Sequence, residues 1–203
     1  MSLTLRQRRA PAPYIVTPSG EWDGDDGEWS TFTIQVGNPP QSFRVLPASV
    51  GQEVWIPVDG ACGGSLESIS NCGDLRGVDR YQDEWSRGFL YDDSTSWNQL
   101  GPFGLALEPK TSDEEDVGMY GLDTVSLGEV PALKTRPELQ EQIVAGVATS
   151  EVWIGRIGLG TQPVTFANTG KDMPSLLVSL RDQNLTTSLS YGYAVGKAYG
   201  RSA

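Results

Sequence analysis

Two short apolar runs separated by a turn of small residues most constrain the fold of this chain. The runs cover residues 43–46 and 54–58, and a third run at 30–36 alternates polar and apolar side chains. Short runs of this kind, bounded by turn residues, are typical of strands. The segment 38–41, Asn-Pro-Pro-Gln, predicts the turn that pairs the third run with the first.

Glycine and proline are frequent, with 24 and 13 among 203 residues, which favours many short strands and turns over long helices. The length fits one domain or two small ones. Apolar patterning predicts further strands, which cover 103–107, 120–127, 142–148, 154–160 and 190–199. One helix is expected, with Pro174 at its start and with Met173, Leu176, Leu177 and Leu180 on one face. We therefore predict an all-β, mainly antiparallel fold with one or two short helices.

The charge and the residue types exclude several kinds of function. The net charge of −11 argues against a nucleic-acid or anionic-membrane partner. Histidine is absent, which removes Ser–His and Cys–His nucleophile pairs and histidine metal ligands, and two cysteines are too few for a zinc site. No run of 18 apolar residues predicts a membrane span, and the amino terminus has no apolar signal core. No cofactor or metal is expected.

The region from 34 to 57 resembles the first active-site hairpin of pepsin-like aspartic peptidases. It reads Ile-Gln-Val-Gly-Asn-Pro-Pro-Gln, then a strand with Phe43, a small-residue turn and Val-Trp-Ile-Pro. In that family, the strand leads into Asp-Thr-Gly-Ser and the turn is followed by Leu-Trp-Val-Pro. Counting back from Trp55, Ala48-Ser49-Val50 takes the place of Asp-Thr-Gly, and a slip of one residue places Ser49-Val50-Gly51 there. Neither register supplies an aspartate.

Weaker matches continue in the family's order along residues 14–199. They include Tyr-Gly-Leu-Asp-Thr-Val at 120–125, Ile-Gly-Arg-Ile-Gly-Leu-Gly at 154–160, and the helix after Pro174. The resemblance implies a single amino-terminal lobe, a pepsin-like barrel, over 14–203. Residues 1–13 are expected to be a disordered leader or prosegment remnant in which Arg8-Arg9 is a processing signal or part of an ordinary basic tail. The second lobe of the family is missing.

The resemblance also implies a small disulfide loop, because pepsin-like lobes carry one where Cys62 and Cys72 lie; two reduced thiols are the alternative. A bridge closing about ten residues contributes roughly 3 kcal/mol by the chain-entropy argument. It indicates an oxidising compartment, so we expect a secreted or cell-surface protein. The resemblance is to family members of fungal type. Asn184-Leu185-Thr186 is a glycosylation sequon in a predicted loop.

Four apolar residues are candidates for the cleft and its flap: Trp55, Leu105, Leu107 and Tyr120. The family's flap turn, Tyr-Gly-Thr/Ser-Gly, has no counterpart here. Asp123-Thr124 lacks the glycine and the apolar strand of a catalytic pair, and we interpret it as structural. The acidic segment 108–118 is either a contact element or a solvated loop. The acidic stretch 21–28 is interpreted as a solvated turn, since its ligand spacing does not fit a calcium loop.

In this family, two carboxylates share a proton and activate a water, and alanine can do neither. We therefore expect a catalytically inactive lobe that binds an extended peptide or a cell-surface ligand in a retained cleft. Two alternatives stay open. One is an inhibitor or interaction protein, similar to the pepsin-like xylanase inhibitors of plants, and the other is part of an active aspartic endopeptidase whose second lobe is missing. A missing carboxy-terminal lobe or a second copy of the chain is the expected partner.

Overall fold

The computed structural model describes residues 13–105, 117–128, 136–149, 152–166 and 170–194. Most of the predicted leader, including Arg8 and Arg9, therefore lies outside the described residues. So do Leu107 and most of the acidic segment 108–118. No helix in the described ranges is both long and apolar enough to cross a membrane.

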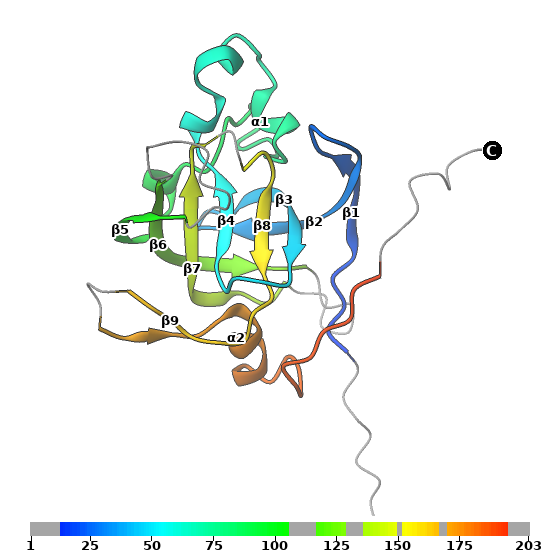
Figure 1. Ribbon diagram of the computed structural model, residues 1–203, viewed down its shortest axis with the longest axis vertical. Helices are drawn as coiled ribbons and strands as arrows, with labels where there is room; N and C mark the ends of the chain where they lie inside the picture. The colour runs from blue at the N-terminus through cyan, green and yellow to red at the C-terminus, as the bar shows by residue number, and fades with distance from the viewer. Residues whose placement is uncertain (1–12, 106–116, 129–135, 150–151, 167–169, 195–203) are drawn as a thin grey trace, which may run out of the picture.

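The described chain is mostly strand, as predicted (Figure 1). The large sheet contains β1 (Pro18–Asp23), β2 (Trp29–Val36), β3 (Gln41–Ala48), β4 (Val54–Pro57), β5 (Asn98–Gly104), β6 (Val117–Ser126), β7 (Leu139–Val147) and β8 (Gly155–Gly158). A small second sheet pairs β9 (Val164–Thr165) with β10 (Asp172–Met173). Helical segments are short: η1 (Asp59–Cys62), η2 (Gly64–Leu66), α1 (Cys72–Leu75), η3 (Tyr91–Asp93) and α2 (Leu176–Asp182).

The large sheet closes on itself. Its order is β1-β2-β3-β8-β4-β7-β6-β5, and an additional pairing of β2 with β6 joins the sheet into a barrel. Most neighbours are antiparallel, whereas β3–β8 and β4–β7 are parallel, so β8 lies between two strands that precede it by about 100 residues (Figure 1). The barrel interior is apolar, with Phe43, Val45, Ile56 and Val144 at 0% exposure. The closing pair β2–β6 leaves β1 and β5 as the edge strands of this sheet.

Three expectations need correction. The first flap strand was predicted at 103–107, but β5 covers Asn98–Gly104 with a register shift between Gln99 and Gly101. This edge strand is largely exposed, so the apolar pattern does not mark it. The helix was predicted to begin at Pro174, yet it follows Ser175, whose backbone is extended (φ −70°, ψ 161°), and Met173 belongs to β10. Met173, the residue before Pro174, is disfavoured in helical conformation, which agrees with its place in β10, and the extended Ser175 is the cap from which the helix starts.

The third correction concerns the last predicted strand, 190–199. Residues 190–194 are extended but pair with no strand among the described residues, and the rest of the range lies outside them. Tyr193 instead contacts Phe32 of β2 through its ring, with 5.9 Å between the ring centroids. The described part, residues 190–194, therefore contacts the barrel through the Tyr193 ring and is not part of the sheet.

The predicted disulfide is confirmed between Cys62 and Cys72, both of which are buried. Beside it lies Arg76, a fully buried side chain at 0% exposure. Its guanidinium donates to the carbonyl oxygens of Ala61 (2.7 Å), Thr149 (3.0 Å) and Val152 (2.6 Å). These bonds tie the disulfide loop to the segment after β7, and burial lowers the pKa of Arg76.

A second buried arginine, Arg44 of β3, holds three acidic side chains together. It pairs with Asp23 (3.1 Å), with Asp74 (3.0 Å) and with Asp79. Burial lowers the pKa of Arg44, but the three carboxylates outweigh that effect and raise it overall. This ion cluster fastens β1 and the segment after α1 to β3, which is a structural role.

Candidate functional site

The turn at the end of β3 is the centre of the candidate site. Ala48 is the last residue of β3, Ser49 and Val50 are exposed, and Gly51 adopts a positive φ of +84°. The turn therefore ends on a residue whose conformation favours glycine. No side chain of this turn carries a carboxylate.

The segment that follows β8 is hydrogen-bonded to the backbone of the turn. The backbone N–H of Leu159 donates to the carbonyl of Ala48 (2.8 Å), and that of Gly160 donates to the carbonyl of Gly51 (2.9 Å). Gly158 lies so close that a Cβ on it would be 2.6 Å from the carbonyl oxygen of Gly51. Glycine here allows the backbone of β8 to approach the turn, as expected from the Gly-rich run at 154–160.

Three of the four predicted cleft residues come together on the outer face of the barrel. Trp55, Leu105 and Tyr120 are buried in one apolar cluster, and Leu107 lies outside the described residues. Phe103 and Phe166 complete an aromatic group with Tyr120, with ring centroids 5.0–5.8 Å apart. Sequence reasoning missed Phe166, because nothing in the local pattern indicates that it meets the flap strands.

Arg156 of β8 lies against this cluster. Its guanidinium carbon is 3.3 Å from the centroid of the Trp55 ring, a stacked cation–π contact. Burial lowers the pKa of Arg156, while the nearby Glu53 carboxylate acts in the opposite direction. Neither Arg156 nor Glu53 was a predicted site residue. The sequence did offer one signal for them. Arg156 and Glu53 are each the one charged residue of an apolar strand region, at a position that faces away from the barrel core.

Tyr120 shares this environment, and its pKa is raised to about 12. Burial is the main cause, and the Glu53 carboxylate adds to it, whereas Arg156 acts in the opposite direction. The phenol of Tyr120 is therefore neutral at acid and neutral pH. Its role in the cluster is packing and hydrogen bonding rather than acid–base chemistry.

We predict that alkaline titration of tyrosinate absorbance includes one group near pH 12 that Tyr120→Phe removes. Because the folded pKa lies above the ordinary value of 10.0, Tyr120 contributes stability that is complete below about pH 10 and is lost as the pH rises through about 12. Tyr120→Phe should therefore lose less stability than the original chain over that interval, as measured by urea unfolding. Equal losses would contradict the environment described for Tyr120.

The other acidic candidates lie away from the turn. Asp123 is 1% exposed, and its Oδ1 accepts from the Ser96 hydroxyl (2.5 Å) and from the Thr124 backbone N–H (2.7 Å). Asp26, in the acidic stretch 21–28, accepts from the Trp29 indole N–H (2.8 Å). In the described part of the chain, no group of three or more potential metal ligands is arranged to hold an ion.

Asn184 is exposed and follows the end of α2, with a φ of +59°. Its backbone N–H donates to the carbonyl of Arg181 (2.8 Å). The side chain is thus available to solvent on a turn, and glycosylation at this sequon stays a prediction.

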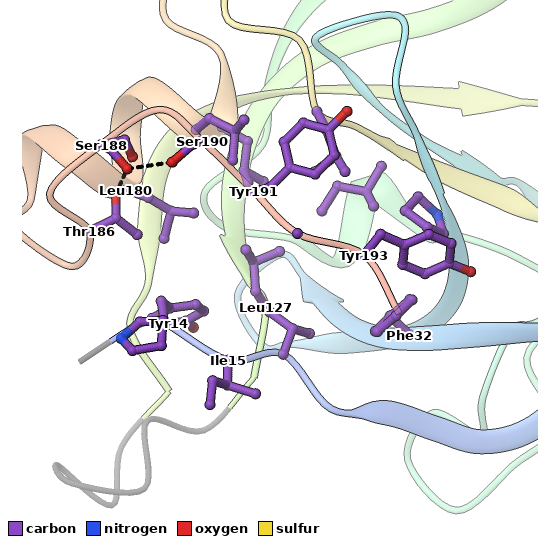
Figure 2. Close-up of a pocket in the computed structure, with 18 of the residues that line it drawn as sticks. Tyr14, Ile15, Phe32, Leu127, Leu180, Thr186, Ser188, Ser190, Tyr191 and Tyr193 are labelled. Atoms are coloured by element: carbon purple, nitrogen blue, oxygen red, sulfur yellow. Dashed lines mark hydrogen bonds between the residues drawn. The ribbon is translucent and has the colours of Figure 1, made fainter. Parts of the chain in front are cut away.

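A hollow lies beneath the barrel, away from the turn. Its volume is about 710 Å³, and it lies between α2, the amino-terminal segment 13–17 and the carboxy-terminal segment 186–194 (Figure 2). Its floor is apolar, with Leu127, Ile157 and Leu180 among the lining residues, and Tyr191 and Tyr193 lie along one side. The Tyr14 hydroxyl donates to the carbonyl of Gly128 (3.1 Å) and so anchors the amino-terminal segment at its rim.

Comparison of the sequence with models of known protein families found no match, and comparison with curated proteins found none either. The outer-face site and the lower hollow therefore have to be interpreted from their own chemistry. The outer-face site combines an aromatic group, a stacked guanidinium and a turn without a carboxylate. The lower hollow is apolar and flanked by extended backbone.

Proposed function

We propose that this chain is a lobe of a pepsin-like aspartic-peptidase homologue that has lost catalysis and binds an extended peptide, or a peptide-like surface ligand, across the turn at Ala48. The observation that carries the proposal is the side chain at the end of β3. Where the resemblance requires a carboxylate, the chain places the methyl group of Ala48, followed by the hydroxyl of Ser49. Neither can act as the base that activates water.

Binding without catalysis is physically reasonable at this place. Extended peptides are held mainly by backbone hydrogen bonds and by pockets for alternate side chains, and neither needs a catalytic residue. Ser49 and Val50 are exposed, and the aromatic group around Tyr120 lies on the outer face of the sheet that contains Trp55. The disulfide is compatible with the proposed location outside the cell.

We predict that the chain does not cleave a broad peptide library at acid pH, with or without pepstatin, and that Ala48→Asp alone does not create activity. One carboxylate cannot share a proton with a second that is absent. Product analysis by mass spectrometry checks this result. Pepstatin-sensitive cleavage by the original chain would overturn the proposal and support the active-endopeptidase alternative.

The lower hollow supports a second part of the proposal, a second copy of this chain as partner. Residues 13–17 and 186–194 border an apolar volume, and neither segment pairs with a strand among the described residues (Figure 2). Extended backbone beside an apolar surface is suited to strand addition from another chain. Covering the hollow by a second copy would remove apolar surface from water.

Multi-angle light scattering tests the dimer, and we expect the measured mass to rise toward twice 21.9 kDa with concentration. Ile15→Glu should shift the equilibrium to the monomer, because it places a charge at an exposed apolar residue that lines the hollow. Leu90→Glu, at an exposed leucine that does not line the hollow, is the control and should leave the equilibrium unchanged. A monomer at every concentration would contradict this part of the proposal.

A further inference from the structure

The guanidinium of Arg156 has no hydrogen bond or ion pair with any other described residue, although its carbon lies 3.3 Å from the Trp55 ring centroid. A guanidinium carries five N–H donors in a planar fork. Stacking on an indole occupies one face of that plane and leaves the donors at its edge available. A half-buried cation whose donors have no acceptor among the described residues is therefore the main unexplained group of the outer-face site.

The strand register places this cation on the same side of the sheet as the turn. Arg156 lies opposite Leu46 on the parallel neighbour β3, and Gly158 lies opposite Ala48. Across the antiparallel neighbour β4, Arg156 lies opposite Trp55. Since side chains alternate along a strand, Arg156, Trp55 and Ala48 share one face. The guanidinium Nη2 is 3.9 Å from the point that a Cβ on Gly51 would occupy. Because glycine has no side chain, the turn does not block a ligand from reaching the guanidinium on this side.

Glu53 is the acidic side chain that influences Arg156, but another group already engages it. Its Oε2 accepts from the backbone N–H of Gln52 (3.0 Å), and it makes no ion pair with Arg156 in the described structure. Its charge still opposes the approach of further negative charge. A singly charged anion is therefore favoured at this place over a doubly charged one.

We propose that Arg156, supported by Trp55, binds the carboxylate of an acidic side chain in the bound peptide, beside the turn where a catalytic carboxylate is absent. The proposal rests on the proposed peptide-binding function and adds to it the class of side chain that is recognised. The planar fork of arginine matches the two oxygens of a carboxylate, and such charge-assisted pairs are stronger than neutral hydrogen bonds.

The experiment has two arms. In the first, immobilised protein selects from a library of extended peptides, and the affinities of selected Glu peptides are compared with those of their Glu→Gln analogues. In the second, N-acetylglutamate amide and N-acetylglutamine amide are titrated into labelled protein, and the Nε–H signal of Arg156 and the indole N–H signal of Trp55 are followed by NMR. Each arm uses the original chain, Arg156→Gln and Glu53→Gln, all confirmed as folded by their unfolding curves.

We expect Glu peptides to bind about tenfold more tightly than Gln peptides, the scale of one charge-assisted hydrogen bond. Arg156→Gln should bring this ratio close to one, and Glu53→Gln should raise it, because removing a competing charge strengthens the site. The glutamate probe, but not the glutamine probe, should shift both NMR signals, and the shift should weaken with added salt.

The two proposals fail in different ways. Selected peptides without acidic preference, together with no response of Arg156 to the glutamate probe, would overturn the carboxylate site and leave peptide binding standing. No selected peptide, with a saturable response of Arg156 to the glutamate probe, would overturn peptide binding and support the anion site by itself. A Glu/Gln ratio that Arg156→Gln leaves unchanged would also overturn the inference.

Discussion

Arg76→Met is expected to lower the free energy of unfolding by about 3–5 kcal/mol, the range seen when a buried charged group and its partners are separated. Methionine fills a similar volume but donates no hydrogen bond. The carbonyls of Ala61, Thr149 and Val152 would each lose the donor that Arg76 supplies. An unsatisfied buried acceptor costs about 1–3 kcal/mol, and partial rehydration keeps the total below the simple sum.

Urea unfolding with the disulfide intact measures this effect. Arg181→Met is the matched control, because Arg181 is half-exposed and forms an ion pair with the adjacent Asp182. Exposed ion pairs of this kind contribute about 0–1 kcal/mol. If Arg76→Met were as stable as Arg181→Met, the buried guanidinium would not be the link between the disulfide loop and the segment after β7.

Gly158→Ala is expected to cost about 3 kcal/mol, at the upper end for overpacking. The added Cβ would meet the backbone of Gly51 at 2.6 Å and that of Gln52 at 2.8 Å, and backbone atoms cannot rotate away as a side chain can. The turn would have to move away from β8. The stacking of Arg156 on Trp55 should change with it, because Arg156 belongs to the same short strand.

Gly104→Ala is the control, since a Cβ there meets no atom within 4 Å. It should change the stability by less than about 0.5 kcal/mol. Urea unfolding measures both variants, and near-ultraviolet circular dichroism reports on the tryptophan environment. Equal stability of the two would mean that β8 and the turn have room to separate, against the close approach seen here.

Many of the strands could be predicted from the sequence, because their signals are local, whereas the disulfide was expected from the resemblance. Alternating runs such as 30–36 and the turn at 38–41 determine β2 and β3 through neighbouring residues. The start of α2 and the position of β5 were misjudged for equally local reasons, Pro174 before an extended Ser175 and a polar edge strand. Because β5 is largely exposed, its sequence needs no apolar pattern.

The charged residues of the fold could not be predicted in the same way. Arg44 and Arg156 are each a single charge in an apolar segment, Arg76 lies among other charged residues, and the partners of all three are distant in sequence. Arg76 reaches Val152, and Arg156 reaches Trp55, only after the strands are arranged. The absent aspartate at Ala48 was evident from the sequence, whereas the cation beside it required the pairing of β8 with β3 and β4.

The position of β8 between β3 and β4 has a consequence for how the chain reaches its native state. β3 pairs with β8 across about 110 residues of chain, so a nascent polypeptide exposes the facing edges of β3 and β4 until β8 emerges from the ribosome. Contacts of such long sequence separation slow folding, because their loop entropy is lost before they form. Assembly of the turn at Ala48 is therefore a late event, and chains truncated before Gly155 would present one unpaired edge of β3 and one of β4 to chaperones and to one another.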